Sequence, residues 1–248
     1  MRQAVPLSFS PDGTQLLVGS NLESTQQLYA LPVRGGALEQ LTAADEPVSG
    51  FFLPDGRILV EKDVGGNERA QLYILGDGLE PLVMDPRFVH RTPHAAGNVL
   101  AYSTNRRNGV DFDIVARDLE TGDERVFDLV GNCTVEGVSP DGRWIAAERA
   151  GERSGDNDLY LCDVETGNVK HVTSHDQPAE FYSPAWLGEM LVLSTNDGRD
   201  PFPLSRHGAF VPASSWHLAC RASAPPPSLP TLATAAGHAG YQHFGICL

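Results

Sequence analysis

The sequence predicts an all-β chain that folds as a β-propeller, because two patterns recur with a common period. The first is a Pro-Asp-Gly turn followed by a β-rich run, and it is found at Pro11, Pro54 and Pro140, with a further proline in phase at Pro184. These prolines are separated by 43, 86 and 44 residues, and 86 is twice 43. The second pattern is a short strand in phase with the turns, at 27–31, 71–75, 113–117 and 158–162. A period of about 40 to 45 residues with several short strands is typical of four-stranded propeller blades.

The turns themselves have a clear physical basis. Proline sets φ for the second position of a tight turn, aspartate hydrogen-bonds its own backbone, and glycine takes the positive φ that strains other residues. The copy expected midway between Pro54 and Pro140 is degraded, since 94–102 keeps Gly97 and the strand but has lost Pro-Asp. A further hairpin turn recurs with a 45-residue offset, as Asp-Leu-Glu-Thr-Gly at 118–122 and Asp-Val-Glu-Thr-Gly at 163–167.

Four blades and part of a fifth follow from these markers, in an incomplete ring. The blades are expected at 5–42, 47–84, 88–128, 133–173 and, partially, 181–200. The expected strands are 5–9, 15–20, 26–31 and 38–41; 48–52, 57–62, 70–75 and 80–83; 88–92, 99–103, 113–118 and 125–127; 134–138, 144–149, 158–163 and 169–172; then 181–186 and 190–194. No stretch shows apolar spacing at 3.6 residues over three turns, so no helix is predicted.

The composition changes abruptly after Asp200. Residues 201–248 contain no Asp, Glu or Lys, but they hold seven of the 18 prolines and four of the eight histidines. We expect this Pro/Ala-rich, low-complexity tail to be irregular. Two interpretations stay open: the tail is a natural disordered extension, or it is read from a shifted frame, because the repeat breaks off in mid-blade.

The net charge and the composition limit the kinds of partner and the cellular location that we expect. The net charge of −14 argues against a nucleic-acid partner, since phosphate binding needs a basic stripe. No secretory h-region and no run of about 18 apolar residues is present, so we expect a cytoplasmic protein without a membrane partner. The cysteines show no metal-binding or disulfide spacing and are interpreted as buried or incidental thiols: Cys133, Cys162, Cys220 and Cys247.

Two histidine pairs are candidates for metal binding or catalysis. His171 and His175 are four residues apart, but the glutamate of a His-Glu-x-x-His motif is missing and the pair falls at a strand end. His90 and His94 flank a proline near the first turn of the third blade. We interpret both pairs as surface-loop residues.

Acidic and glycine-rich segments are interpreted as turns. Asp-Phe-Asp at 111–113 and Asp-Asn-Asp at 156–158 resemble pieces of calcium loops, yet each precedes the third strand of a blade, where hairpin turns favour these residues. Gly-Gly-Asn at 65–67 and Arg-Gly-Gly at 34–36 lack the spacing of a phosphate-binding loop. The sequence therefore predicts no metal and no cofactor.

Aromatic strand residues are predicted to pack between neighbouring blades rather than to form a ligand platform. These residues are Phe9, Phe52, Trp144 and Trp186. Three tail histidines have no nucleophile or base beside them in sequence, and we expect no catalytic role for them: His217, His238 and His243.

Three segments of the sequence resemble a known protein family. Segments 63–73, 101–114 and 139–144 resemble the propeller of the prolyl-oligopeptidase family of serine peptidases, especially its acylaminoacyl-peptidase-like branch. The Ser-Pro-Asp-Gly turns alone are shared with TolB-like propellers. The family resemblance implies a seven- or eight-bladed propeller over an α/β-hydrolase domain that hydrolyses peptides, with the propeller gating and orienting the substrate and a Ser-Asp-His triad on a Gly-x-Ser-x-Gly elbow.

This sequence departs from the family in one decisive respect. It contains no Gly-x-Ser-x-Gly, and 137–141 ends in aspartate within a propeller turn. We therefore assign no catalytic, cofactor-binding or metal-binding residue. One hypothesis is the propeller portion of such a peptidase, truncated and inactive alone, with a peptide substrate. The alternative is a freestanding TolB-like propeller that binds a protein or peptide. In either case an open arc exposes blade flanks through which copies can associate.

Overall fold

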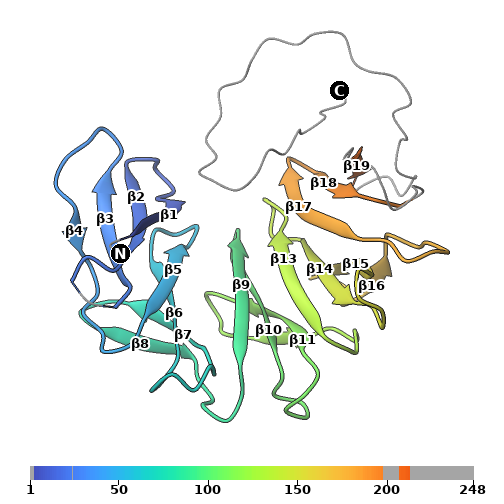
Figure 1. The fold of residues 1–248 in the computed structure, drawn as a ribbon, viewed down its shortest axis with the longest axis horizontal. Helices are drawn as coiled ribbons and strands as arrows, with labels where there is room; N and C mark the ends of the chain where they lie inside the picture. The colour runs from blue at the N-terminus through green and yellow to red at the C-terminus, as the bar shows by residue number, and fades with distance from the viewer. Residues whose placement is uncertain (1–2, 24, 198–206, 213–248) are drawn as a thin grey trace, which may run out of the picture.

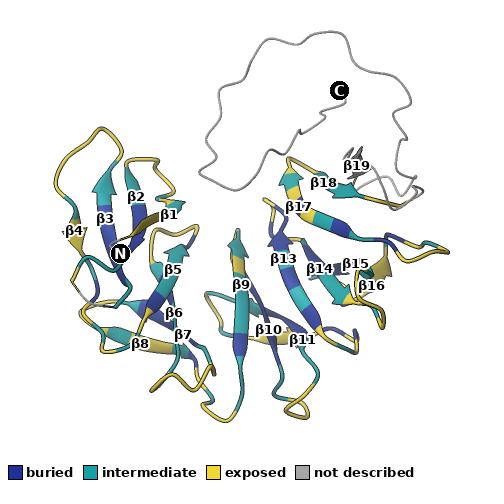
Figure 2. Cartoon of the chain, in the orientation of Figure 1, coloured by how far each residue is buried: buried dark blue, intermediate teal, exposed yellow. Residues whose placement is uncertain are grey.

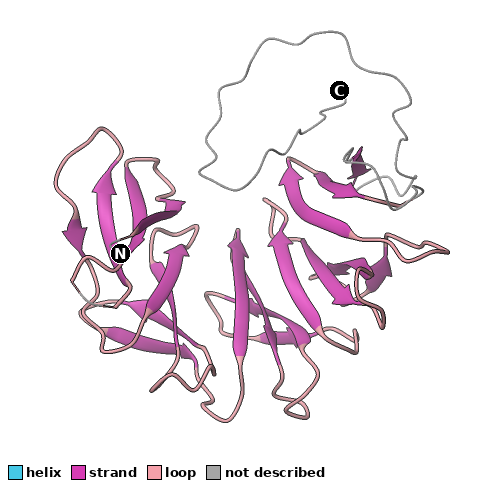
Figure 3. Cartoon of the chain, viewed as in Figure 1, coloured by secondary structure: helices cyan, strands magenta, loops and turns pink. Residues whose placement is uncertain are grey.

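Five antiparallel sheets lie side by side along an arc, with the first and fifth sheets at its two ends (Figure 1). The structure is a computed structural model and describes residues 3–23, 25–197 and 207–212. All regular structure in these ranges is β-strand (Figure 3), and none of the described residues forms a helix that could span a bilayer. The predicted all-β propeller architecture is thus confirmed.

Each sheet is a meander whose strands pair in chain order. The first two sheets comprise β1 (Ala4–Phe9), β2 (Gln15–Ser20), β3 (Gln27–Pro32) and β4 (Glu39–Gln40), then β5 (Val48–Phe52), β6 (Ile58–Lys62), β7 (Gln71–Leu75) and β8 (Leu79–Val83). The third and fourth comprise β9 (His90–Ala96), β10 (Val99–Thr104), β11 (Asp113–Asp118) and β12 (Glu124–Val126), then β13 (Cys133–Val138), β14 (Trp144–Ala150), β15 (Asn157–Asp163) and β16 (Val169–His171). The fifth comprises β17 (Phe181–Leu187), β18 (Met190–Thr195) and β19 (His207–Pro212).

The fifth sheet differs from the sequence prediction, which placed two strands there and none in the tail. The structure adds β19, which pairs antiparallel with β18 from Met190 opposite Pro212 to Thr195 opposite His207. Without β19, one edge of β18 would be unpaired. Pairing with β19 satisfies the backbone hydrogen-bonding groups along that edge. The rest of the tail, 201–206 and 213–248, lies outside the described residues.

The repeated turns form as their residue types require. In the turn after β13, the Ser139 hydroxyl donates to Asp141 Oδ1 at 2.5 Å, and the backbone N–H of Arg143 donates to the same oxygen at 3.1 Å. Gly142 takes φ of +75° and donates its N–H to the Ser139 carbonyl at 2.8 Å. The turn after β1 repeats these contacts, with the Thr14 N–H donating to Asp12 Oδ1 at 3.0 Å.

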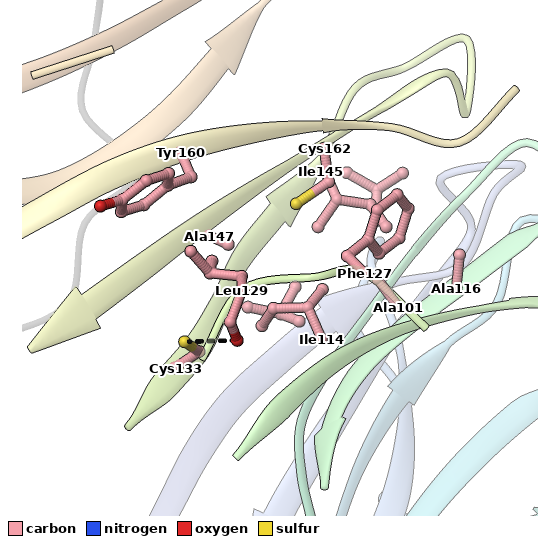
Figure 4. Packing of buried hydrophobic residues seen from close by; sticks show 12 residues of the cluster. Ala101, Ile114, Ala116, Phe127, Leu129, Cys133, Ile145, Ala147, Tyr160 and Cys162 are labelled. Atoms are coloured by element: carbon pink, nitrogen blue, oxygen red, sulfur yellow. Dashed lines mark hydrogen bonds between the residues drawn. The ribbon is translucent and has the colours of Figure 1, made fainter. Parts of the chain in front are cut away.

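Buried apolar side chains form separate clusters between neighbouring sheets rather than one central core. Figure 2 shows that every sheet contributes buried strand residues. The contact between the third and fourth sheets is the largest cluster (Figure 4), and its fully or nearly fully buried members include Ile114, Phe127, Leu129, Cys133, Ile145 and Cys162. Similar clusters join the first sheet to the second, the second to the third and the fourth to the fifth. The second, third and fourth sheets are therefore stabilised by a sheet on either side, whereas the first and fifth each pack against one described sheet.

The two described cysteines belong to this packing. The Cys133 thiol donates to the Leu129 carbonyl at 3.6 Å, and Cys162 is fully buried (Figure 4). Burial raises the pKa of Cys133 to about 11 and that of Cys162 to about 12, so both thiols are neutral and unreactive. The prediction of buried thiols is confirmed for these two residues, whereas Cys220 and Cys247 lie outside the described residues.

Candidate functional site

A cluster of histidine and aspartate side chains lies at the loop end of the fourth sheet. Tyr160 on β15 pairs with His171 on β16, and Asp158 lies two residues before Tyr160 on the same face of the strand. The Asp158 carboxylate therefore reaches His171 Nε2 at 2.6 Å, and it binds Arg149 on β14 at 3.1 Å. The His171 ring stacks on Tyr160 with centroids 4.7 Å apart.

The His175 side chain connects two segments: the one that leads into the fifth sheet and the loop before β15. Its side chain is only 8% exposed, with Nε2 2.9 Å from Asp156 Oδ1 and Nδ1 2.7 Å from the Thr173 carbonyl oxygen. The Ala179 N–H also donates to Asp156 Oδ1, at 3.1 Å. The Thr173 carbonyl and the Asp156 carboxylate raise the pKa of His175, while the Ala179 N–H and His175 lower that of Asp156.

His175 thus lies in a loop, as interpreted, but its side chain is not on the surface. His171 is exposed, as interpreted, but it ends strand β16 instead of lying in a loop. The His175 side chain is largely buried because the segment after β16 folds back onto the loop before β15, where Asp156 accepts from His175 and from the Ala179 N–H. The pairing of β15 with β16 brings the Asp-Asn-Asp segment 156–158 against both histidines. Its interpretation as a simple turn did not predict these contacts. Within the described ranges, no group of three or more His, Cys, Asp and Glu side chains is arranged to hold a metal ion.

His90 is also buried, contrary to the surface-loop interpretation. It begins β9, is 1% exposed and packs edge-on against Tyr102 with ring centroids 5.8 Å apart. Neither of its ring nitrogens has a hydrogen-bond partner among the described residues. Burial and the nearby Arg106 charge lower the pKa of His90 to about 4. His94, four residues on, is exposed as expected, but it too lies in strand β9 and not in a loop.

Three glutamates gather where the fourth sheet meets the fifth. Glu136 lies in the irregular pairing between Val135 and Gly137 on β13, Glu148 lies on β14, and Glu180 immediately precedes β17. Burial, then the charge of Glu148, raises the pKa of Glu136 to about 7. Burial chiefly, with a smaller effect of Glu180, raises the pKa of Glu148. A cationic group placed here would favour the charged form of both carboxylates and offset their mutual repulsion.

The remaining acidic segment serves the local structure. The Arg107 Nε donates to both carboxylate oxygens of Asp113, at 3.1 and 3.0 Å, and Arg107 Nη2 lies 3.3 Å from Asp111. Gly65, Gly66 and Gly35 take positive φ in loops. Both findings agree with the interpretation of these segments as turns.

Two grooves open between sheets at the opposite end, beside the repeated turns. The larger, of about 710 Å³, lies between the fourth and fifth sheets and is lined by residues including Arg143, Trp144, Asp163, Lys170, Trp186 and Glu189. The smaller, of about 430 Å³, lies between the third and fourth sheets and is lined by residues including Val99, Asp118, Glu124, Arg125 and Val164.

The predicted aromatic packing holds for three of the four residues. Trp144 and Trp186 pack against the cluster between the fourth and fifth sheets, and Phe52 packs against the cluster between the first and second. Phe9 is instead 58% exposed, because its side of β1 belongs to the end of the arc. The tail histidines His217, His238 and His243 lie outside the described residues.

Comparison with known proteins identifies the fold. No family model and no curated protein matches the sequence. Among solved structures, TolB from Agrobacterium tumefaciens is 21% identical, with a TM-score of 0.60 over 85% of this chain and 77% of that chain. An oligogalacturonate lyase in complex with manganese is 18% identical, with a TM-score of 0.66 over 86% of this chain and 63% of that chain.

A puromycin-hydrolyzing peptidase from Mycobacterium tuberculosis is 15% identical, with a TM-score of 0.63 over 87% of this chain. The chain spans only 37% of the length of that peptidase. At these identities the likeness shows the fold alone. The described part of the chain is a propeller module with the fold of TolB-like propellers.

Proposed function

We propose that this chain is the substrate-binding propeller portion of a serine peptidase similar to prolyl oligopeptidases, and that it binds peptides without hydrolysing them. One observation carries the proposal. The fold of 87% of this chain is similar to that of 37% of a puromycin-hydrolyzing peptidase. The sequence resemblance at 63–73, 101–114 and 139–144 supports it. Because the sequence contains no Gly-x-Ser-x-Gly elbow, we expect the chain alone to be inactive. In a complete enzyme the propeller would gate and orient the substrate.

The glutamates at the junction of the fourth and fifth sheets support a peptide with a cationic group. Glu136 and Glu148 are half-buried, and the pKa of each is raised by burial and by a neighbouring carboxylate. A peptide amino terminus or a basic side chain placed between them compensates both unfavourable effects. The net charge of −14 would attract the same ligands over longer distances.

The test is binding of fluorescein-labelled peptides, measured by fluorescence anisotropy. A peptide with a free amino terminus and an arginine is expected to bind more tightly than its acetylated, arginine-free counterpart. The double variant E136Q/E148Q should weaken binding of the cationic peptide about tenfold. The matched control is Glu61→Gln, since burial alone raises the pKa of Glu61, without a neighbouring carboxylate. Equal binding of the two peptides would exclude a cationic recognition site.

Hydrolysis is measured in parallel with a chromogenic acyl-peptide. The chain should bind the peptide and release no chromophore. Turnover by the purified chain would contradict the assignment as a binding portion alone.

A freestanding TolB-like propeller that binds a protein partner is the second candidate. It is favoured by the TolB structure from Agrobacterium tumefaciens, of which this chain covers 77%. Sequencing the gene through the codons for Arg199 to Leu248 and beyond separates the two. Another reading frame that restores blades and a Gly-x-Ser-x-Gly elbow supports the peptidase, whereas three frames without them support the freestanding propeller.

A further inference from the structure

One half-buried arginine carries a charge that no described carboxylate neutralises. Seven described arginines form an ion pair with an aspartate or glutamate: Arg57, Arg87, Arg106, Arg107, Arg117, Arg143 and Arg149. Among the described arginines without such a pair, Arg91 on β9 is half-buried, whereas the others are exposed: Arg34, Arg69, Arg125 and Arg153. Burial lowers the pKa of the Arg91 guanidinium. Because charges removed from water are normally paired, this one calls for a partner from outside the described chain.

Two neighbours hold the Arg91 guanidinium in one orientation. Its Cζ lies over the Phe112 ring, 3.5 Å from the ring centroid, and its Nη2 donates to Asn132 Oδ1 at 2.6 Å. Phe112 and Asn132 are fixed relative to each other, because they pair across a parallel bridge and the Phe112 N–H donates to the Gly131 carbonyl at 2.9 Å. The guanidinium is therefore organised before any ligand arrives.

The backbone immediately after Arg91 is strained. Thr92 has φ of +49°, a left-handed conformation that a β-branched residue rarely adopts. It lies in the irregular pairing of β9 with β10 between Ala101 and Ser103. The Thr92 hydroxyl accepts the Val135 N–H at 3.2 Å, so a contact with β13, the first strand of the neighbouring sheet, retains this conformation (Figure 1). A bulge of this kind redirects side chains next to it and is common beside binding sites.

The outer edge of the guanidinium is open to a ligand. A guanidinium carries five N–H groups in one plane, and only one of those of Arg91, on Nη2, donates to a described residue. The contact of Nη2 with Asn132 lies at the surface, and Asn132 is exposed, whereas Nε is buried. Two parallel N–H groups, on Nη1 and Nη2, match the two oxygens of a carboxylate.

We propose that Arg91 binds the carboxylate of a ligand between the third and fourth sheets, through paired N–H groups on Nη1 and Nη2. The nearby Arg107 and Arg149 are already paired with Asp113 and Asp158. One unpaired positive charge matches a carboxylate better than a doubly charged phosphate. The identification of this carboxylate as part of a peptide rests on the proposed function, whereas the anion site itself does not.

The test is calorimetric titration of the full chain with two unlabelled peptides of one sequence, one ending in a free carboxylate and one in an amide. Both are acetylated at the amino terminus and contain no charged residue, so neither offers a cationic group to Glu136 and Glu148. The carboxylate form should bind about tenfold more tightly. Because the net charge of −14 repels anions, such a preference requires a local cation.

Substitutions assign the preference to Arg91. Arg91→Gln should abolish it, and Arg91→Lys should reduce it, because an ammonium group keeps the charge but cannot present two parallel N–H groups. The matched control is Arg34→Gln, which makes the same change of charge at an exposed arginine without an ion pair and should keep the preference.

A second variant tests the site without removing the arginine. Asn132→Asp is nearly isosteric and places a carboxylate where Nη2 now donates to Asn132 Oδ1. This internal partner should abolish the preference without lowering the Tm, so the test holds even if Arg91→Gln does not fold. A preference that survives in Asn132→Asp would overturn the proposal, as would equal binding of the two peptides by the parent.

Two further ligands identify the source of the anion. An acetylated and amidated peptide with one aspartate tests a side-chain carboxylate, and Arg91-dependent binding of either carboxylate peptide supports the site. Inorganic phosphate that binds through Arg91 more tightly than acetate would overturn the assignment to a carboxylate. Because these ligands lack a cationic group, failure of the glutamate site leaves their binding unchanged, and the two failures are distinguishable.

Discussion

His175 and Asp156 form a hydrogen-bonded pair, 2.9 Å apart, that links the chain entering the fifth sheet to the loop before β15. The other ring nitrogen of His175 lies 2.7 Å from the Thr173 carbonyl oxygen. Because both neighbours are acceptors, both ring nitrogens donate in the best-bonded state, and the imidazole is then cationic. Because the pKa of His175 is raised from 6.5, the strength of this link changes with pH near neutrality.

The first prediction concerns stability above neutral pH. Since the pKa of His175 is raised above 6.5, its stabilising effect is complete below about pH 6.5 and is lost as pH rises through the folded-state pKa. Asp156 stays ionised throughout this range because its pKa is lowered. Between pH 6 and pH 9 the Tm of the parent should fall relative to that of His175→Gln. The difference should correspond to a loss of stability on the order of 1 kcal/mol. A Tm difference between the two proteins that stays constant over this range would refute the assignment.

The second prediction concerns His90, whose contribution to stability is lost as the pH falls and not as it rises. Its pKa is lowered from 6.5 to about 4, so the stability that neutral His90 contributes is complete above pH 6.5 and is lost as pH falls toward 4. His90→Phe keeps a ring against Tyr102 and removes two nitrogens that have no partner among the described residues. The Tm of this variant should exceed that of the parent at pH 5 by more than at pH 7. Parallel Tm curves for the two proteins would count against a buried neutral histidine.

The third prediction concerns Gly50 in β5. A Cβ atom at this position would overlap the backbone carbonyl of Leu59 in the neighbouring strand, which cannot move without breaking the sheet. Gly50→Ala should therefore lower the free energy of unfolding in urea by about 2 kcal/mol or more. Gly78→Ala is the control, since nothing lies within 4 Å of its Cβ position and its φ is not positive. We expect the control to change stability by less than about 0.5 kcal/mol.

The fourth prediction concerns association through the ends of the arc. Phe9 on the first sheet is 58% exposed and Leu187 on the fifth is 52% exposed. The residue that corresponds to Phe9 in the second sheet, Phe52, packs against the first sheet. Because the two end surfaces differ, copies should associate head to tail and form open-ended species. Sedimentation velocity should show a mean mass that grows with concentration.

Charged substitutions test whether these surfaces are responsible. Phe9→Lys and Leu187→Lys should each shift the sedimentation profile toward monomer. Val110→Lys is the control, because Val110 is 75% exposed in a loop away from both ends. A monomer at every concentration, in parent and variants alike, would rule out association through these ends.

The candidate functional residues were only partly predictable. The 156–158 segment and the His171, His175 pair were recognised separately, but as a turn and as surface loop. Asp156 and His175 are 19 residues apart, and they meet because β15 and β16 pair with Tyr160 opposite His171. His90 was misplaced because its burial depends on a contact within the third sheet, between its ring on β9 and that of Tyr102 on β10. No local pattern in the sequence reports either contact.

The sequence by itself determined the repeat, the strands of the four complete sheets and the chemistry of their turns. It could do so because proline, aspartate and glycine act on the backbone within a few residues, and because strand patterns are local. Only the tertiary structure decided which side chains meet between sheets, that β19 extends the fifth sheet, and that Phe9 is exposed while Phe52 is packed. Those outcomes depend on register and on the presence of a neighbouring sheet, which are properties of residues distant in the chain.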